Sequence, residues 1–94
     1  MKRIKIFNQT GSFAENKDIA RAIRIKEIFP ALKNQEEVIL DFKRVEAATQ
    51  SFIHALISDV IRTFGGEALD KMAFQSCNET VKKIINIVTD YMQE

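Results

Sequence analysis

The chain has few of the residues that build cross-links, metal sites or flexible linkers. It holds one cysteine, Cys77, and one histidine, His54, so no internal disulfide and no metal cluster with the usual spacings can be assembled. One proline and three glycines argue against a long linker or a low-complexity tail. Neither GxGxxG nor GxxxxGK[ST] occurs, so no glycine-rich phosphate loop is predicted. We expect no metal, no cofactor and no catalytic constellation.

Long apolar runs are also missing. No stretch approaches the length that spans a bilayer, and residues 1–9 lack the apolar core of a signal peptide. The single cysteine is compatible with a reducing compartment. A hydrophobic content of 46% with 29% charged residues is typical of a soluble globular chain. We therefore expect one cytoplasmic domain over residues 1–94, without a membrane segment.

The small net charge of +1 is unevenly distributed. Residues 1–33 carry eight basic and three acidic side chains, whereas residues 34–94 carry six basic and ten acidic ones. A basic N-terminal third is compatible with contacts to nucleic acid or to an acidic partner. The basic residues are scattered without interleaved aromatic residues, so a solvated helix face is the simpler interpretation, and nucleic acid is not the expected partner.

Alternating or continuous apolar runs predict four strands, at 2–8, 12–14, 38–42 and 71–77. Apolar residues at helical spacing predict three helices. The first spans 16–29, capped by Asn16 and ended or kinked at Pro30, because a proline disfavours helical geometry at the residue before it. The second runs from about residue 51 to 64 and ends at Gly65 and Gly66, and the third follows Asn78 up to Met92.

Strands that alternate with helices at short spacing predict an α/β fold. The segment 38–42 is almost entirely apolar, which is typical of a central strand covered on both faces in a parallel sheet. We expect a single-layer, mainly parallel sheet of three to five strands, packed with about three helices.

The junction between the 38–42 strand and the second helix is the most informative part of the chain. It places Thr49, Gln50 and Ser51 at a helix N-terminus, where four free N–H groups favour a polar cap or an anion. Thr49 or Ser51 is suited to cap the helix. Alternatively, this turn is a docking surface with either hydroxyl as a phosphoacceptor.

Three further residues have two interpretations each. Asp41 interrupts a buried strand, so it either hydrogen-bonds the following loop or lines a functional surface. His54 lies at the edge of the helix's apolar face, where it either packs at the boundary or contacts a partner. Cys77 stands at a strand end before a helix cap, where it is either a small, partly buried residue or a thiol with a lowered pKa.

The segment LDFKRVEAATQSF, followed by a long apolar helix that ends in glycine, resembles the bacterial STAS-like domain family, small relatives of anti-sigma-factor antagonists. In the antagonists, a partner kinase phosphorylates the first serine of an Asp-Ser-Ser-Gly turn, which switches partner binding. Counted from Val45, Thr49 to Phe52 take the place of that turn. Gln50 stands at the phosphorylated position and has no hydroxyl, whereas Ser51 keeps the second serine.

The resemblance implies a STAS-like fold and a non-catalytic regulatory module that binds a protein partner, in the manner of a partner-switching component. The implied partner is an ATP-binding, histidine-kinase-like protein. Two alternatives stay open: a nucleic-acid-associated regulator that uses the basic third, or a small nucleotide-binding protein or enzyme. The latter would use the cleft at the strand ends, near Asp41, Thr49, Ser51 and Cys77.

Overall fold

The structure is a computed structural model that describes residues 1–92. Its strands form two parallel sheets, one of three strands in the order β1-β3-β5 and one that pairs β2 with β4. The strands are β1 (Lys2–Lys5), β2 (Phe13–Ala14), β3 (Val38–Asp41), β4 (Ala47–Ala48) and β5 (Met72–Gln75). Every pairing is parallel, which confirms the predicted α/β fold with a mainly parallel sheet.

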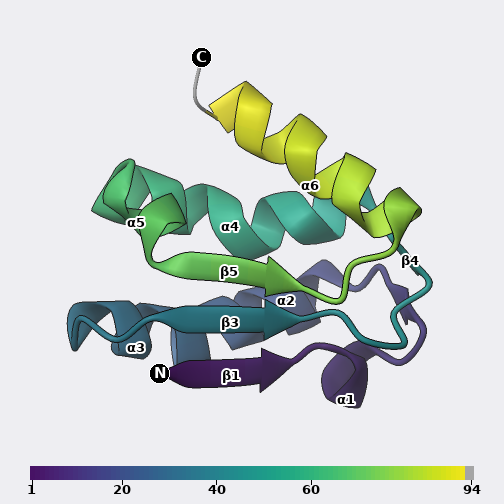
Figure 1. Cartoon of the computed structure of the whole chain (residues 1–94), viewed down its shortest axis with the longest axis horizontal. Helices are drawn as coiled ribbons and strands as arrows, with labels where there is room; N and C mark the ends of the chain where they lie inside the picture. The colour runs from purple at the N-terminus through teal and green to yellow at the C-terminus, as the bar shows by residue number, and fades with distance from the viewer. Residues whose placement is uncertain (93–94) are drawn as a thin grey trace.

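Three long helical stretches correspond to the three predicted helices (Figure 1). The first is continuous but changes type along its length, and consists of α2 (Lys17–Ile23), η1 (Arg24–Ile28, a π-helix) and α3 (Phe29–Lys33). The others are α4 (Gln50–Phe64) and α6 (Glu79–Met92). Two one-turn helices, α1 (Phe7–Thr10) and α5 (Glu67–Asp70), were not predicted. None of the helices in residues 1–92 is long and apolar enough to cross a membrane.

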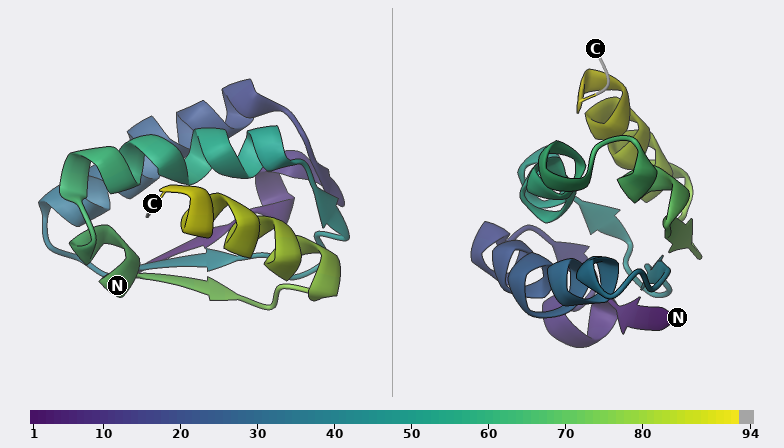
Figure 2. Two further views of the ribbon diagram at one scale, coloured as in Figure 1. Left: turned by 90° about the horizontal axis from the view of Figure 1, so that it is seen from above. Right: turned by 90° about the vertical axis from the view of Figure 1, so that its left-hand side faces the viewer.

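The helices lie on one side of the three-stranded sheet. Figure 2 shows α2, α3 and α4 packed behind the strands, with α6 crossing beside α4. No helix of residues 1–92 covers the other face, which is turned toward the viewer in Figure 1. Ile39 of β3 points to that face and is absent from the core cluster, although Val38 and Leu40 belong to it. All four residues of β3 are buried, as its apolar run predicts, although helices cover only one of its faces.

The core lies between the sheet and the helix layer. Because β1, β3 and β5 are in register, Ile4, Leu40 and Phe74 share the core face, whereas Lys5, Asp41 and Gln75 share the open face. The largest fully buried side chains come from strands, loops and helices alike: Phe42, Phe52, Ile4, Ile6, Ile23, Ile28, Leu40, Ile53, Leu56, Ile57, Val38 and Val60.

The first long helix does not end at Pro30, so of the two predicted outcomes, an end or a kink, the first was wrong. Phe29 keeps helical dihedral angles (φ −58°, ψ −49°), and α3 continues to Lys33. The N–H of Phe29 donates to the carbonyl of Arg24, five residues earlier, so the turn before the proline is π-helical. A proline removes an N–H and clashes with the carbonyl four residues before it, and the wider π turn relieves both problems.

The first strand is shorter than predicted. Ile6 already has helical dihedral angles, and its carbonyl accepts hydrogen bonds from the N–H groups of Gln9 and Thr10. The Thr10 hydroxyl donates to the same carbonyl at 3.2 Å. These local bonds favour a helical turn over two more strand residues, and the fully buried Ile6 anchors that turn in the core.

Candidate functional site

Thr49, one of the two residues predicted to cap α4, is the N-cap of this helix. Thr49 has extended dihedral angles (φ −85°, ψ 156°), and its hydroxyl accepts the N–H of Phe52 at 3.1 Å. Its own N–H donates to the carbonyl of Ala14, which ties the junction to strand β2. Because Thr49 supplies the cap, the exposed Ser51 in the first turn is not needed for it.

An open pocket of about 490 Å³ lies beside this turn. Its lining residues, which we call the α4–α6 surface, come from the start of α2, the first turns of α4 and the end of α6: Lys17, Gln50, Ser51, His54, Ala55, Val88 and Tyr91. The structure thus brings together three of the predicted site residues, Gln50, Ser51 and His54, and places Thr49 directly before them.

The α4–α6 surface is mostly neutral and carries exposed apolar groups. Tyr91 is 66% exposed, and Ile87, which is outside the lining but lies one turn earlier on the same side of α6, is 45% exposed. His54 is half-buried at the edge of the apolar face, as predicted for a boundary position. Lys17 is the one charged side chain in the lining. Exposed aromatic side chains are enriched in surfaces that bind a protein.

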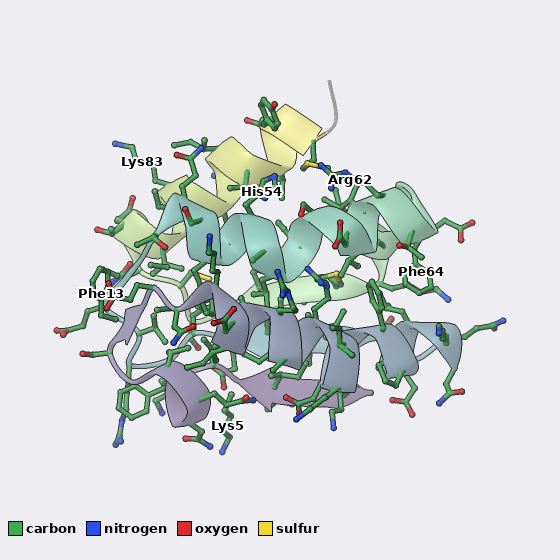
Figure 3. All side chains as sticks on the ribbon, turned by 180° about the vertical axis from the view of Figure 1, so that it is seen from behind. Lys5, Phe13, His54, Arg62, Phe64 and Lys83 are labelled. Carbon is green, nitrogen blue, oxygen red and sulfur yellow. The ribbon has the colours of Figure 1, made fainter. Side chains whose placement is uncertain are left out.

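Sequence reasoning did not find Lys17, Ala55, Val88 or Tyr91. The sequence did carry one signal for an exposed apolar surface on α6. Ile87 and Tyr91 lie four residues apart, and both are outside the stripe of Val81, Ile85 and Val88 that packs into the core. Which end of α6 meets the start of α4 depends on how the two helices cross (Figure 3). That geometry follows from tertiary packing, which the local pattern does not encode.

Asp41 belongs to a different site from Ser51 and His54. Its carboxylate accepts the N–H of Lys43 at 3.0 Å and pairs with the Arg3 guanidinium at 3.1 Å. This confirms the prediction that Asp41 hydrogen-bonds the loop after its strand. It also lines a pocket of about 510 Å³, which we call the strand-end pocket and which is formed by Arg3, Lys5, Phe7, Asn8, Asp41, Lys43 and Arg44.

Cys77 lines neither of these two pockets. Its side chain is half-buried against the core, and its thiol lies 3.8 Å from the carbonyl oxygen of Gln75. Burial raises the pKa of the Cys77 thiol, the nearby Lys82 opposes this effect, and Asp41 adds to it. The alternative of a lowered pKa was therefore wrong, because desolvation outweighs the single neighbouring cation.

The basic N-terminal third does not form one continuous patch. Arg3 and Lys5 line the strand-end pocket, and Lys17 lines the α4–α6 surface. Arg24 bridges to α4, where its guanidinium donates to the Ala55 carbonyl at 2.7 Å and pairs with Asp59 at 3.3 Å. Within residues 1–92, no group of three His, Cys, Asp or Glu side chains is arranged to hold a metal ion.

Residues 20–82 match the family model described as a STAS-like domain of unknown function (DUF4325). No curated protein and no solved structure matches the chain. The matched segment includes β3, β4, α4 and β5, and therefore the junction at Thr49 and Ser51 on which the resemblance rested. A STAS-like domain suggests a regulatory role, and such domains are generally non-catalytic. The match covers well over half of the chain, and we conclude that this protein belongs to the STAS-like domain family.

Proposed function

We propose that this protein is a non-catalytic regulatory module that binds a protein partner through the α4–α6 surface. The proposed partner is an ATP-binding, histidine-kinase-like protein, as the family resemblance implies. The observation that carries the proposal is the position of Ser51. It is exposed in the first turn of α4, is released from capping by Thr49, and shares a pocket with His54 and Tyr91.

The composition of this surface supports a protein partner over a small ligand. Tyr91 and Ile87 together offer exposed apolar area on one side of α6, and Gln50 and Ser51 offer hydrogen-bonding groups on α4. Exposed tyrosines surrounded by polar residues are common where binding energy concentrates in interfaces. The pocket is more open to solvent than the second pocket of similar volume, beside Asp41, so a protruding side chain of a partner fits it better than an enclosed metabolite.

Phosphorylation of Ser51 would act as a switch by simple electrostatics. A phosphate adds nearly two negative charges, and the free N–H groups of the α4 N-terminus stabilise negative charge at that place. Lys17 stands on the rim of the same pocket and would pair with the phosphate. The helix would gain stability, while the surface that a partner contacts would change from weakly basic to acidic.

The test is capture of partners from lysate of the source cells, with and without ATP, followed by mass spectrometry of the captured proteins and of the bait. Three baits are compared: wild type, Ser51→Glu and Thr80→Glu. Thr80 is a matched control because it is an exposed hydroxyl residue at the second position of α6, as Ser51 is at the second position of α4.

We expect one ATP-binding protein to be captured by wild type and by Thr80→Glu, and at least about tenfold less by Ser51→Glu. With ATP, we expect phosphate on Ser51 in the wild-type bait. Equal capture by all three baits would contradict the placement of the interface. Absence of any specific partner in the wild-type sample would contradict the proposed function itself.

A further inference from the structure

We propose that the strand-end pocket binds the phosphate group of a small molecule. The pocket lies where β1 and β3 end, and its lining joins residues of these strands to the first residues of α1. Ligands of open α/β sheets commonly sit outside the carboxyl ends of the strands. This site shares no lining residue with the α4–α6 surface, so the inference does not rest on the proposed function.

The charges of the pocket favour an anion. Four basic side chains line it, Arg3, Lys5, Lys43 and Arg44, against a single acidic one, Asp41. Asp41 is already engaged by Arg3 and by the Lys43 N–H. Within residues 1–92, the charged groups of Lys5, Lys43 and Arg44 have no ion-pair partner. Three uncompensated cations around one concave surface create a positive potential that attracts a multiply charged anion.

These cations come from two distant segments that parallel pairing brings together. Lys5 is in register with Asp41, so the residues after β1 and the residues after β3 surround the same space. Lys43 and Arg44 are positioned by a tight turn, in which the N–H of Val45 donates to the carbonyl of Phe42 at 3.0 Å. The hydrogen bond from the Lys43 N–H to Asp41 fixes the start of this turn.

Arg44 occupies a backbone position that favours glycine. Its φ angle is +72°, in the left-handed region that side-chain-bearing residues rarely adopt, and it is the third residue of the turn. The guanidinium lies 5.8 Å from the centre of the Phe7 ring, so the ring holds it at the wall of the pocket. A role of the Arg44 side chain in binding would explain why this strained position holds an arginine and not a glycine.

The size of the pocket favours a small molecule over nucleic acid. A volume of about 510 Å³ falls within the range of small-molecule sites, roughly 300–1,000 Å³. Nucleic acid would need a longer basic track, whereas other basic residues of the N-terminal third, such as Lys17 and Arg24, face other parts of the molecule. Phe7 adds a half-buried apolar surface against which the organic part of a phosphorylated metabolite can pack.

The test is titration of the full-length, ¹⁵N-labelled protein with pyrophosphate, inorganic phosphate and AMP, followed by amide chemical shifts. Sodium chloride of equal ionic strength is the reference. We expect saturable shifts confined to residues 5–8 and 41–45. Stronger binding of AMP than of phosphate would indicate an organic phosphate as the ligand, and stronger binding of pyrophosphate would indicate free polyphosphate.

Two variants and one control test the assignment of the residues. Lys43→Gln removes one cation, and we expect roughly tenfold weaker binding of pyrophosphate, because a hydrogen bond to a charged group is lost. Arg44→Gly removes another cation and also relieves the positive φ, so we expect weaker binding without a lower unfolding temperature. Lys83→Gln makes the same change of charge on the exposed side of α6 and should bind as wild type does.

Three results would overturn the proposal. The first is the absence of saturable shifts in the pocket with all three probes. The second is equal weakening by Lys43→Gln and Lys83→Gln, which would indicate general charge screening. The third is binding of a single-stranded oligonucleotide far tighter than any small probe, with shifts that extend beyond the pocket, which would assign the cations to nucleic acid.

Discussion

The molecule has two polar regions at the ends of its strands, and they differ in charge and in local construction. At the β4–α4 junction, Thr49 caps the helix with a neutral hydroxyl, and exposed Ser51 and Tyr91 stand beside it. At the end of β3, Asp41 and Arg3 form an ion pair among several other cations. The first region is neutral and partly apolar, and the second is strongly basic.

The comparison shows that one small domain carries a nearly neutral surface on its helices and a basic pocket at the ends of its strands. A neutral surface with an exposed tyrosine loses little hydration energy when a protein covers it, whereas a basic pocket attracts small anions from a distance. The two regions share no lining residue, since the α4–α6 surface lies on the helices and the strand-end pocket is lined by the ends of β1 and β3 and the residues that follow them.

The largest expected effect comes from the core that supports both regions. Phe42 follows β3 and Phe52 lies in the first turn of α4, and both are fully buried. We expect Phe42→Ala and Phe52→Ala each to lower the free energy of unfolding by about 3–5 kcal/mol, measured by urea denaturation. Phe13→Ala, at a 48% exposed position, should cost less than about 1 kcal/mol. A small cost at Phe42 or Phe52 would show that the corresponding region is not anchored in this core.

Removal of the Thr49 cap should have a moderate effect on the first region alone. We expect Thr49→Ala to lower the free energy of unfolding by about 1 kcal/mol, because the Phe52 N–H loses its acceptor. Thr49→Ser keeps the hydroxyl, so its free energy of unfolding should stay close to that of wild type. The same urea series measures both variants. A loss of similar size in Ser51→Ala would contradict the assignment of the cap.

Asp41→Asn separates the charge of Asp41 from its hydrogen bond to the loop. The amide oxygen still accepts the Lys43 N–H, but the ion pair with the half-exposed Arg3 is lost, at a cost of about 1 kcal/mol or less. The pocket becomes more positive, so pyrophosphate should bind more tightly. Thermal unfolding measures the expected loss of stability, and calorimetric titration measures the expected gain in affinity for pyrophosphate. Weaker pyrophosphate binding would count against the anion site.

The smallest effect concerns Cys77, whose pKa is raised by burial and further by Asp41. The folded state holds the thiol proton more tightly than the unfolded state does. This contribution to stability is therefore present at neutral pH and is lost as the pH rises through the raised pKa. Alkylation by iodoacetamide should be slow at pH 7 and should accelerate at alkaline pH.

In Asp41→Asn, one cause of the raised pKa is gone, so we expect the alkylation curve of Cys77 to move slightly toward lower pH. Lys83→Gln serves as the control for a distant change of charge. A shift toward higher pH in Asp41→Asn would contradict the sign of the Asp41 influence.

Features that depend on near neighbours in sequence were predicted correctly. Asn16 caps α2 and Asn78 caps α6, with hydrogen bonds to N–H groups two or three residues later. Gly65 ends α4 with a φ of +71°, which few other residues adopt without strain. The apolar run of β3 also indicated its central place in the sheet.

Features that depend on tertiary structure were missed or only partly predicted. The π-helical turn before Pro30 belongs to a helix that the buried Ile23 and Ile28 anchor in the core. The strand-end pocket joins Lys5 to Lys43 through the parallel pairing of β1 and β3. The sequence showed these basic residues but not the register that brings them together.

The most direct test of the account is a pair of chemical-shift maps on the same ¹⁵N-labelled protein. One map uses the partner captured with the wild-type bait, and the other uses pyrophosphate. We predict that the partner perturbs amides at residues 50–55 and 87–91, that pyrophosphate perturbs those at 5–8 and 41–45, and that neither ligand displaces the other. Overlapping maps, or displacement of the partner by pyrophosphate, would contradict the separation of the two regions.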